Sequence, residues 1–299
     1  MSITHHQYCP EDFSRVSDFL IAHYLTENRD GNWLQPAWEY MHTHPYLDED
    51  SLDKIRIWQE NGEIVAVVHY ESRLGEVFFQ IHPDYTALKP EMLEYAERSL
   101  KGSTKEGKSY LHVFENDFDD ALNSLVTSKG YMRINAEDRP LSMLSIPDPF
   151  PEITVPKGFV IKSLADDNDL YKINRVLWRG FNHPGEPPEE DEDIEERKKM
   201  QSGPNFRKEL TIVVEAPSGD FVSFAGTWFV PQKKYVYVEP VATDPNFRRM
   251  GLGRAALLES IRRCKELGAE VAYVGSGQKF YQKLGFKKIF TSQCWEKVW

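Results

Sequence analysis

Two glycines and three arginines lie close together directly after an apolar stretch at residues 236–243. They belong to the loop RRMGLG and to the start of a helical pattern behind it. Glycine lets a backbone approach a phosphate closely, and the N–H groups at a helix start favour an anion. The loop therefore predicts a pyrophosphate site with mobile positive charge around it, although a purely structural turn would use the same glycines. The residues expected at this site are Arg248, Arg249, Met250, Gly251, Leu252, Gly253 and Arg254.

The composition favours a globular cytoplasmic protein. No apolar run among the 299 residues approaches the ~20 needed to span a bilayer, and the first residues lack the pattern of a signal peptide. Three widely spaced cysteines argue against a disulfide framework or a zinc site, and the histidines of the first half lack metal-ligand spacing, so we expect no metal. The net charge of −11 disfavours nucleic acid as a partner and favours a cation.

The order of expected elements occurs twice along the chain. Residues 146–158 hold four prolines and are interpreted as an extended linker. Each half beside the linker runs helix, hairpin, strand, helix, strand, helix, and the first hairpin turns at Asn61 and Gly62. We therefore expect a tandem α/β fold (α+β), with domains at residues 1–145 and 159–299. Each domain should contain a mixed, mostly antiparallel sheet flanked by helices. The main helices are expected near residues 12–25, 90–100, 164–181 and 251–267.

The second half resembles the GNAT superfamily of acetyl-CoA-dependent N-acetyltransferases. The loop RRMGLG is similar to the coenzyme A loop of that family, PVATDPNF before it to the fourth strand, and FYQKLGFKK after it to the C-terminal tyrosine signature. The strongest match covers residues 235–288, and a weaker resemblance covers nearly the whole chain. The resemblance implies a tandem GNAT protein with one active and one degenerate copy, and acetyl-CoA as the co-substrate.

The resemblance also implies that the strand at residues 235–243 separates from the next strand, with the thioester in the gap. Pro240 has no N–H to donate to a ladder and favours a bulge at this point. The backbone N–H of Val241, Ala242 or Thr243 is then expected to stabilise the developing oxyanion. Removing one such donor typically costs ~3 to 4 kcal/mol.

Two side chains are candidates for proton transfer. Tyr281 matches the general-acid tyrosine of the family, four residues before Gly285, and an ordinary phenol pKa of about 10 lies near the ~8.5 of a thiol. An aromatic residue that only packs is the alternative for this position. Glu239 is the candidate base, directly or through water, with a strand residue paired to Arg or Lys as the alternative. Val274 departs from the family, which often has asparagine there.

The first half lacks the residues that the second half offers for catalysis. Pro90 and Glu91 stand where the second half has its glycine pair, so one N–H donor is lost and a carboxylate is expected to face the phosphate position. Val126 stands where the second half has Tyr281. We therefore expect the first half to support the fold or to shape the acceptor site, without catalysing a reaction.

An acidic segment before the second hairpin bears on the acceptor. Its carboxylates are expected to attract an amine such as a polyamine, an aminoglycoside or a basic peptide. A solvated loop whose acids begin a helix near residue 191 is the competing interpretation. The acidic residues are Glu186, Glu189, Glu190, Asp191, Glu192 and Asp193.

These features together predict an N-acetyltransferase that moves an acetyl group directly to a primary amine of a small molecule or peptide in a ternary complex. A noncatalytic acyl-CoA-binding sensor or scaffold is the alternative. A dinucleotide-binding protein is disfavoured because the loop lacks the full Gly-x-Gly-x-x-Gly pattern. The sequence leaves open whether the two copies pair within one chain or between the chains of a homodimer.

Overall fold

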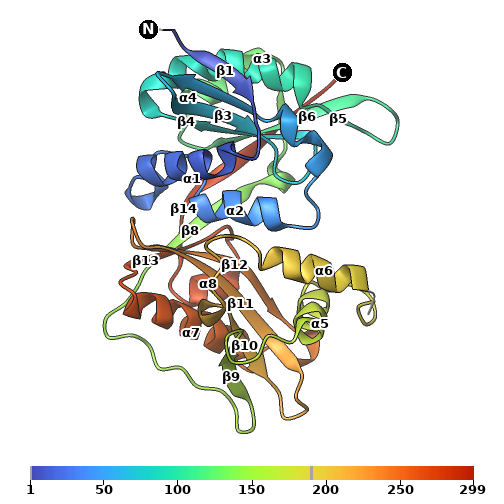
Figure 1. Cartoon of the computed structure of the whole chain (residues 1–299), viewed down its shortest axis with the longest axis vertical. Coiled ribbons are helices and arrows are strands. Elements are labelled where there is room, and N and C mark those ends of the chain that lie inside the picture. Colours follow the sequence, from blue (N-terminus) through green and yellow to red (C-terminus); the bar gives the residue numbers. More distant parts are fainter. Residues whose placement is uncertain (1, 189–190) are drawn as a thin grey trace. The chain divides into compact units, whose positions relative to one another are not determined.

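The chain forms two compact units (Figure 1). The computed structural model describes residues 2–188 and 191–299, and of residues 191 and 192 only the backbone. The first unit runs up to Leu141 and also contains Lys288–Trp299, and the second unit is Ser142–Lys287. The two sequence halves therefore correspond to two folded bodies, but with bounds that differ from the expected domains.

The bounds differ because each unit contains one strand from outside its expected half. In the first unit, β14 (Lys287–Val298) pairs with β6 (Ser109–Asn116). In the second unit, the last four residues of β8 (Arg139–Ser145) pair with β13 (Val271–Val274). Both strands are antiparallel to their neighbour. The two halves have therefore exchanged the strand that completes each sheet.

The segment expected to be a linker belongs to the second unit. Residues 146–158 contain neither helix nor strand, as expected from their prolines. Phe150 and Val155 nevertheless pack against the core of this unit, and Lys265 Nζ donates a hydrogen bond of 2.9 Å to Pro147 O. The segment is therefore anchored by packing and hydrogen bonds.

The sheet of the first unit has the order β1, β2, β3, β4, β6, β14, with β5 beside β6 and β7 beside β14. β4 and β6 run parallel, and the other described pairs run antiparallel. The remaining strands are β1 (Thr4–Gln7), β2 (Arg56–Glu60), β3 (Glu63–His69), β4 (Glu76–Ile81), β5 (Gly102–Ser103) and β7 (Met132–Arg133). The helices are α1 (Asp12–His23), α2 (Gln35–Thr43), α3 (Lys89–Ser99) and α4 (Asp120–Ser128).

Local sequence explains the turns of the first unit. Asn61 and Gly62 both have positive φ, 53° and 87°, and form the expected two-residue hairpin between β2 and β3. The Asp119 side chain accepts a hydrogen bond from Leu122 N and caps α4. Gly130 follows the end of α4 with φ 83°, the left-handed conformation that glycine adopts easily.

The sheet of the second unit has the order β9, β10, β11, β12, β13, β8. β12 and β13 run parallel, and the other described pairs run antiparallel. The remaining strands are β9 (Val160–Ser163), β10 (Ile212–Glu215), β11 (Phe221–Val230) and β12 (Tyr235–Thr243). The helices are α5 (Leu170–Gly180), α6 (Asp191–Met200), α7 (Leu252–Glu266) and α8 (Lys279–Lys283).

Helices cover both faces of the second sheet (Figure 1). Leu257 and Ile261 of α7 pack in one apolar cluster, and Ile173 and Leu177 of α5 pack in another with side chains from the opposite sheet face. All residues of the central strand β11 are buried as a result. Among the described residues, no helix combines the length and the apolar character needed to cross a membrane.

Candidate active site

The parallel strands β12 and β13 separate in the middle of the second sheet. Their pairing ends at Val238 and Val274, whereas β12 continues along β11 to Thr243. The register with β11 shifts at this point, so that Pro240 lies in the expected bulge. Gly226 is required opposite the bulge, because a Cβ there would lie 2.4 Å from Glu239 O. The bulge thus occurs where Pro240 predicted it, and the strands separate where the family resemblance implied.

Hydrogen-bond alternation shows which amides of β12 face the gap. Asp244 N donates to Val222 O of β11 at 3.0 Å. In an antiparallel pair, alternate residues point their N–H groups toward the partner strand, so Ala242 N–H also points toward β11. The N–H groups of Val241 and Thr243 point away from β11, toward the gap. The expectation that Ala242 is an oxyanion donor is therefore wrong, because its N–H group points toward β11.

A cavity of about 670 Å³ lies in this gap, within the ~300–1,000 Å³ typical of ligand sites. Met250 was expected in the site but is 41% exposed and stands outside the cavity lining. Residues 180–182, which follow α5, also line the cavity and were not predicted. The expected residues that line the cavity are Val241, Ala242, Thr243, Arg248, Arg249, Gly251, Leu252, Gly253, Arg254 and Tyr281.

The glycines of the loop are both required by geometry. Gly251 precedes α7 with φ 84°, in the left-handed region. A Cβ on Gly253 would lie 2.8 Å from Thr243 Oγ1, which is itself 3.0 Å from Ser223 Oγ. The first N–H groups of α7 lack intrahelical partners and lie beside the cavity, so this wall suits a phosphate group.

The three arginines of the loop have different surroundings. Arg248 donates to Thr243 O at 3.1 Å and to Gly180 O at 2.8 Å, and Arg254 donates to Glu152 O at 3.1 Å. These two guanidinium groups hold the loop in place, which corrects the expectation of three mobile charges. Arg249 lines the cavity and makes no hydrogen bond or ion pair with any residue that the structure describes.

A buried ion pair fixes the end of α5 beside the end of β12. Arg179 donates to both carboxylate oxygens of Asp244, which is 1% exposed. Burial alone would raise the pKa of Asp244, but hydrogen bonds from Arg179 and from Asn246 N hold that pKa below its usual value. Gly180 follows directly, and a Cβ there would lie 2.6 Å from Ala242 Cβ. This contact brings residues 180–182 to the cavity wall.

Tyr281 lies on α8 and lines the cavity with only 8% of its surface exposed. The rings of Phe280 and Phe286 pack against it in edge-on geometry. Burial and, to a lesser degree, the negative charge of Glu239 raise the pKa of Tyr281 to about 12. Its hydroxyl makes no hydrogen bond with the residues that the structure describes. The phenol is thus protonated at neutral pH and available to a ligand in the cavity.

Glu239 lies on the bulge of β12 and is half-buried. Its Oε2 accepts a hydrogen bond of 3.0 Å from the hydroxyl of Tyr237. A Cβ on Gly275 would lie 3.8 Å from that hydroxyl, which places Tyr237 where the two strands begin to separate. Glu239 is not among the residues that line the cavity, but its charge raises the pKa of Tyr281.

The acidic segment begins a helix, as one of the two interpretations predicted. α6 starts at Asp191. Glu186 forms ion pairs with Arg175 and Arg179 of α5, at 2.8 Å and 2.6 Å. The acidic residues Glu189 and Glu190 lie outside the described residues.

The corresponding helix start in the first unit is built differently. Pro90 lies in the first turn of α3. Glu91 was expected to face a phosphate position, but its Oε1 accepts a hydrogen bond of 2.8 Å from Trp58 Nε1. Val126 is fully buried, and its carbonyl accepts from Tyr131 N at 3.1 Å, just as the Tyr281 carbonyl accepts from Phe286 N at 3.1 Å. Val126 and Tyr281 therefore occupy equivalent positions.

Comparison with known proteins finds similar acetyltransferases. Residues 169–286 match the model of the acetyltransferase (GNAT) family. The chain is 29% identical over 136 residues to the uncharacterized N-acetyltransferase CgeE of Bacillus subtilis, over 42% of this chain and 48% of that protein. It is 30% identical over 148 residues to a mycothiol acetyltransferase of Thermomonospora curvata, over 47% of this chain and 48% of that protein. The matched region thus spans about half the length of these relatives.

The fold of the whole chain also has a solved counterpart. A tandem GNAT protein from the clavulanic acid biosynthesis pathway superposes with a TM-score of 0.67 over 99% of this chain and 98% of that one, at 12% identity. At this identity the likeness concerns the fold alone. The family match thus makes the second unit similar to the GNAT acetyltransferases, and the whole chain has the fold of a tandem GNAT protein.

Proposed function

We propose that this protein transfers an acetyl group from acetyl-CoA directly to a primary amine, with the second unit carrying the reaction. The observation that supports this most strongly is the cavity lined by the end of β12, the start of α7 and α8. It brings together the glycine loop, two backbone amides and the Tyr281 hydroxyl, which lie far apart in the sequence. Acetyl transfer from a thioester requires a site for each of these roles.

The residues of the cavity fit coenzyme A. The left-handed backbone at Gly251, the close packing at Gly253 and the N-terminal amides of α7 suit its pyrophosphate, and Arg249 adds a cation. The remaining length of the gap runs past Val241 and Thr243, where their N–H groups can donate to the thioester carbonyl oxygen. Bound acetyl-CoA supplies the acetyl group and a thiol leaving group.

The proton balance assigns two further roles. The amine nitrogen forms a bond to the acetyl carbon while the carbon–sulfur bond breaks, so one proton leaves nitrogen and one reaches sulfur. Glu239, held by Tyr237, accepts the first proton directly or through water. Tyr281 donates the second proton to the sulfur, and solvent restores it.

The two proton-transfer groups are coupled through charge. Glu239 contributes to the raised pKa of Tyr281 because its carboxylate disfavours a phenolate nearby. When Glu239 accepts a proton from the amine, that charge disappears and the phenol gives up its proton more readily. Removal of the first proton thus prepares the delivery of the second.

The acceptor is proposed to be a primary amine of a small molecule or peptide, and the reaction to occur in the cytoplasm. A carboxylate near the acceptor, such as Glu239, attracts an ammonium group before the proton is lost. Three widely spaced cysteines suit a reducing compartment. A library of polyamines, aminoglycosides and basic peptides, followed by the release of free coenzyme A, would identify the acceptor class.

Tyr281→Phe tests the mechanism. The variant removes one hydroxyl and keeps the ring packing against Phe280 and Phe286. We expect turnover to fall by about 100-fold or more, in line with the ~10²–10⁴ that general acid–base groups contribute, while acetyl-CoA affinity changes little. Coenzyme A release measures turnover, and calorimetry measures affinity.

Tyr273→Phe is a matched control, because it removes a buried hydroxyl from β13 outside the cavity lining. It should retain turnover. Equal turnover of Tyr281→Phe and the native chain would remove Tyr281 from the mechanism. Saturable acetyl-CoA binding without thiol release for any amine would instead support the noncatalytic acyl-CoA-binding module.

A further inference from the structure

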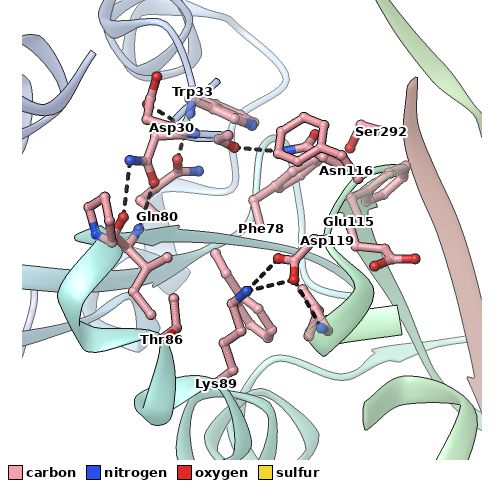
Figure 2. A pocket seen from close by; sticks show the side chains of 18 of the residues that line it. Asp30, Trp33, Phe78, Gln80, Thr86, Lys89, Glu115, Asn116, Asp119 and Ser292 are labelled. Atoms are coloured by element: carbon pink, nitrogen blue, oxygen red, sulfur yellow. Dashed lines mark hydrogen bonds and ion pairs between the residues drawn. The ribbon is translucent and has the colours of Figure 1, made fainter. Parts of the chain in front are cut away.

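The first unit also has a cavity where two parallel strands separate. The pairing of β4 with β6 ends at Val77 and Val113, whereas β4 continues along β3 to Ile81. A cavity of about 330 Å³ lies beyond this point, and its lining includes the ends of both strands and the starts of α3 and α4 (Figure 2). Its place in the sheet corresponds to that of the acyl-CoA cavity in the second unit.

Bonded side chains block the entrance that a coenzyme would use in this unit. Lys89 at the start of α3 donates to both carboxylate oxygens of Asp119, the cap of α4, at 2.7 Å and 2.6 Å (Figure 2). Across the strand gap, Asn32 Oδ1 accepts from Ile81 N at 2.6 Å, and Asn116 Nδ2 donates to Gly31 O at 2.7 Å. The segment at residues 31–32 therefore bridges both strand ends, and an extended pantetheine arm cannot lie between them.

The walls of the cavity combine aromatic rings with one incompletely bonded carboxylate. Glu115 is 3% exposed, and its Oε1 accepts from Asn123 Nδ2 at 3.0 Å and from Trp295 Nε1 at 2.8 Å. Its Oε2 is buried and has no hydrogen-bond partner among the residues that the structure describes. Burial raises the pKa of Glu115 to about 7. The aromatic side chains that line the cavity are Trp33, Phe78, Phe79, Phe114 and Phe118.

The charges at the cavity favour a cation over an anion. Lys89 is neutralised by Asp119, and Arg29, which also lines the cavity, pairs with Glu27 at 2.6 Å. The carboxylate of Glu115 has no cation of this kind bonded to it. A buried carboxylate without a paired cation is costly unless it is protonated or meets a positive group. A carboxylate or phosphate ligand would add repulsion there.

We infer that the cavity of the first unit is a second ligand site, which binds a small molecule carrying one ammonium group on an aromatic or apolar body. The ammonium group pairs with Glu115, and the aromatic side chains pack against the body and attract the positive charge. The site is separate from the acyl-CoA cavity of the second unit. It does not depend on the reaction proposed there.

Calorimetry with 2-phenylethylamine on the full chain, without acetyl-CoA, tests this inference. The amine should bind, and the neutral analogue 2-phenylethanol should bind at least 10-fold more weakly. Glu115→Gln keeps the acceptor oxygen for Asn123 and Trp295 but removes the charge, and should weaken amine binding at least 10-fold. Thr86→Trp places a large ring at an exposed residue of the lining and should abolish binding without disturbing the core.

Glu106→Gln is the control, because it changes an exposed carboxylate of the first unit that lies outside the cavity lining. It should leave 2-phenylethylamine binding unchanged. The inference fails if the amine does not bind, if 2-phenylethanol binds equally well, or if Glu115→Gln and Thr86→Trp bind the amine as tightly as the native chain. Acetyl transfer is not measured in this test, so failure of the proposed reaction would leave its result intact.

Discussion

The two units separate a parallel strand pair at the same place but fill the gap differently. Asp244 N donates to Val222 O in the second unit as His82 N donates to Val65 O in the first, so Thr243 and Ile81 are equivalent. Thr243 N–H points toward the cavity. The equivalent Ile81 N–H is bonded to a side chain, at 2.6 Å from Asn32 Oδ1. The fold creates the gap, and individual side chains decide whether its amides face a ligand.

The bulge marks a second difference. In the second unit, Pro240 is an extra residue that shifts the register between β11 and β12. In the first unit, β3 and β4 pair without such a shift up to Ile81. Phe78 consequently follows Val77 where Glu239 follows Val238. The gap therefore forms without the bulge and without the candidate base. The fold does not require these two features, which we assign to the proposed reaction.

The largest expected effect is on the pH dependence of stability, and it comes from replacing Glu115, the carboxylate in the gap of the first unit. Glu115 has a folded pKa of about 7 against an ordinary 4.5, so the folded state binds its proton more tightly than the unfolded state. The stability it contributes is fully present below pH ~4.5 and is lost as pH rises through about 7, a change of about 3 kcal/mol. Relative to Glu115→Gln, the native chain should lose about this much in urea unfolding between pH 4.5 and pH 8.

Ser276 stands two residues after Val274, as Glu115 stands two residues after Val113, and supplies the control. Ser276→Ala should show the same pH dependence as the native chain. If the free energy of unfolding of Glu115→Gln and that of the native chain changed equally with pH, Glu115 would not make the stability of the first unit depend on pH.

The helix start gives the next largest effect. The first unit lacks the glycine pair of this loop, and Gly253→Glu removes one of these glycines from the second unit. The new Cβ would lie 2.8 Å from Thr243 Oγ1, and the carboxylate would place a negative charge at the expected phosphate position. We expect acetyl-CoA affinity to fall by about 100-fold, or roughly 2.7 kcal/mol, in calorimetry. Leu267→Glu adds the same charge after the exposed end of α7 and should bind normally. Equal affinity of both variants would contradict the assignment of this loop.

Asn32→Ala makes the gap of the first unit resemble that of the second. Asn32 is 2% exposed, and its amide bonds both Ile81 N and Ile81 O. The variant leaves these buried groups without partners and should cost about 2 kcal/mol in urea unfolding. Asn246→Ala, an exposed position in the second unit, should change stability by less than about 0.5 kcal/mol. A similar cost for both would mean that Asn32 does not hold the strand end.

The smallest expected effect is on the pKa of Tyr281, which the charge of Glu239 raises in the second unit. Glu239→Gln removes the charge that adds to the raised pKa of Tyr281, so that pKa should fall from about 12 toward the ordinary 10. Ultraviolet titration of tyrosinate measures it, with Glu239→Gln/Tyr281→Phe subtracted to isolate this residue. An unchanged titration would show that Glu239 and Tyr281 do not influence one another.

Local patterns in the sequence predicted much of this molecule. The hairpin at Asn61 and Gly62, the glycine loop, the bulge at Pro240 and the position of Tyr281 each depend on residues near one another in the chain. The bonds between Asn32 and Ile81 join residues 49 apart, and no local pattern indicates them. The exchange of β8 and β14 was missed because alternation in a strand identifies its buried face but not its neighbour.

The place of β14 also affects how the protein is made. Residues 288–299 belong to the first unit, although the whole second unit precedes them in the chain. During synthesis, the first sheet must therefore wait with β6 unpaired on one edge until these residues leave the ribosome. An unpaired edge is a place where chains associate wrongly. A stalled or shortened translation product would expose that edge in a unit whose other elements are already complete.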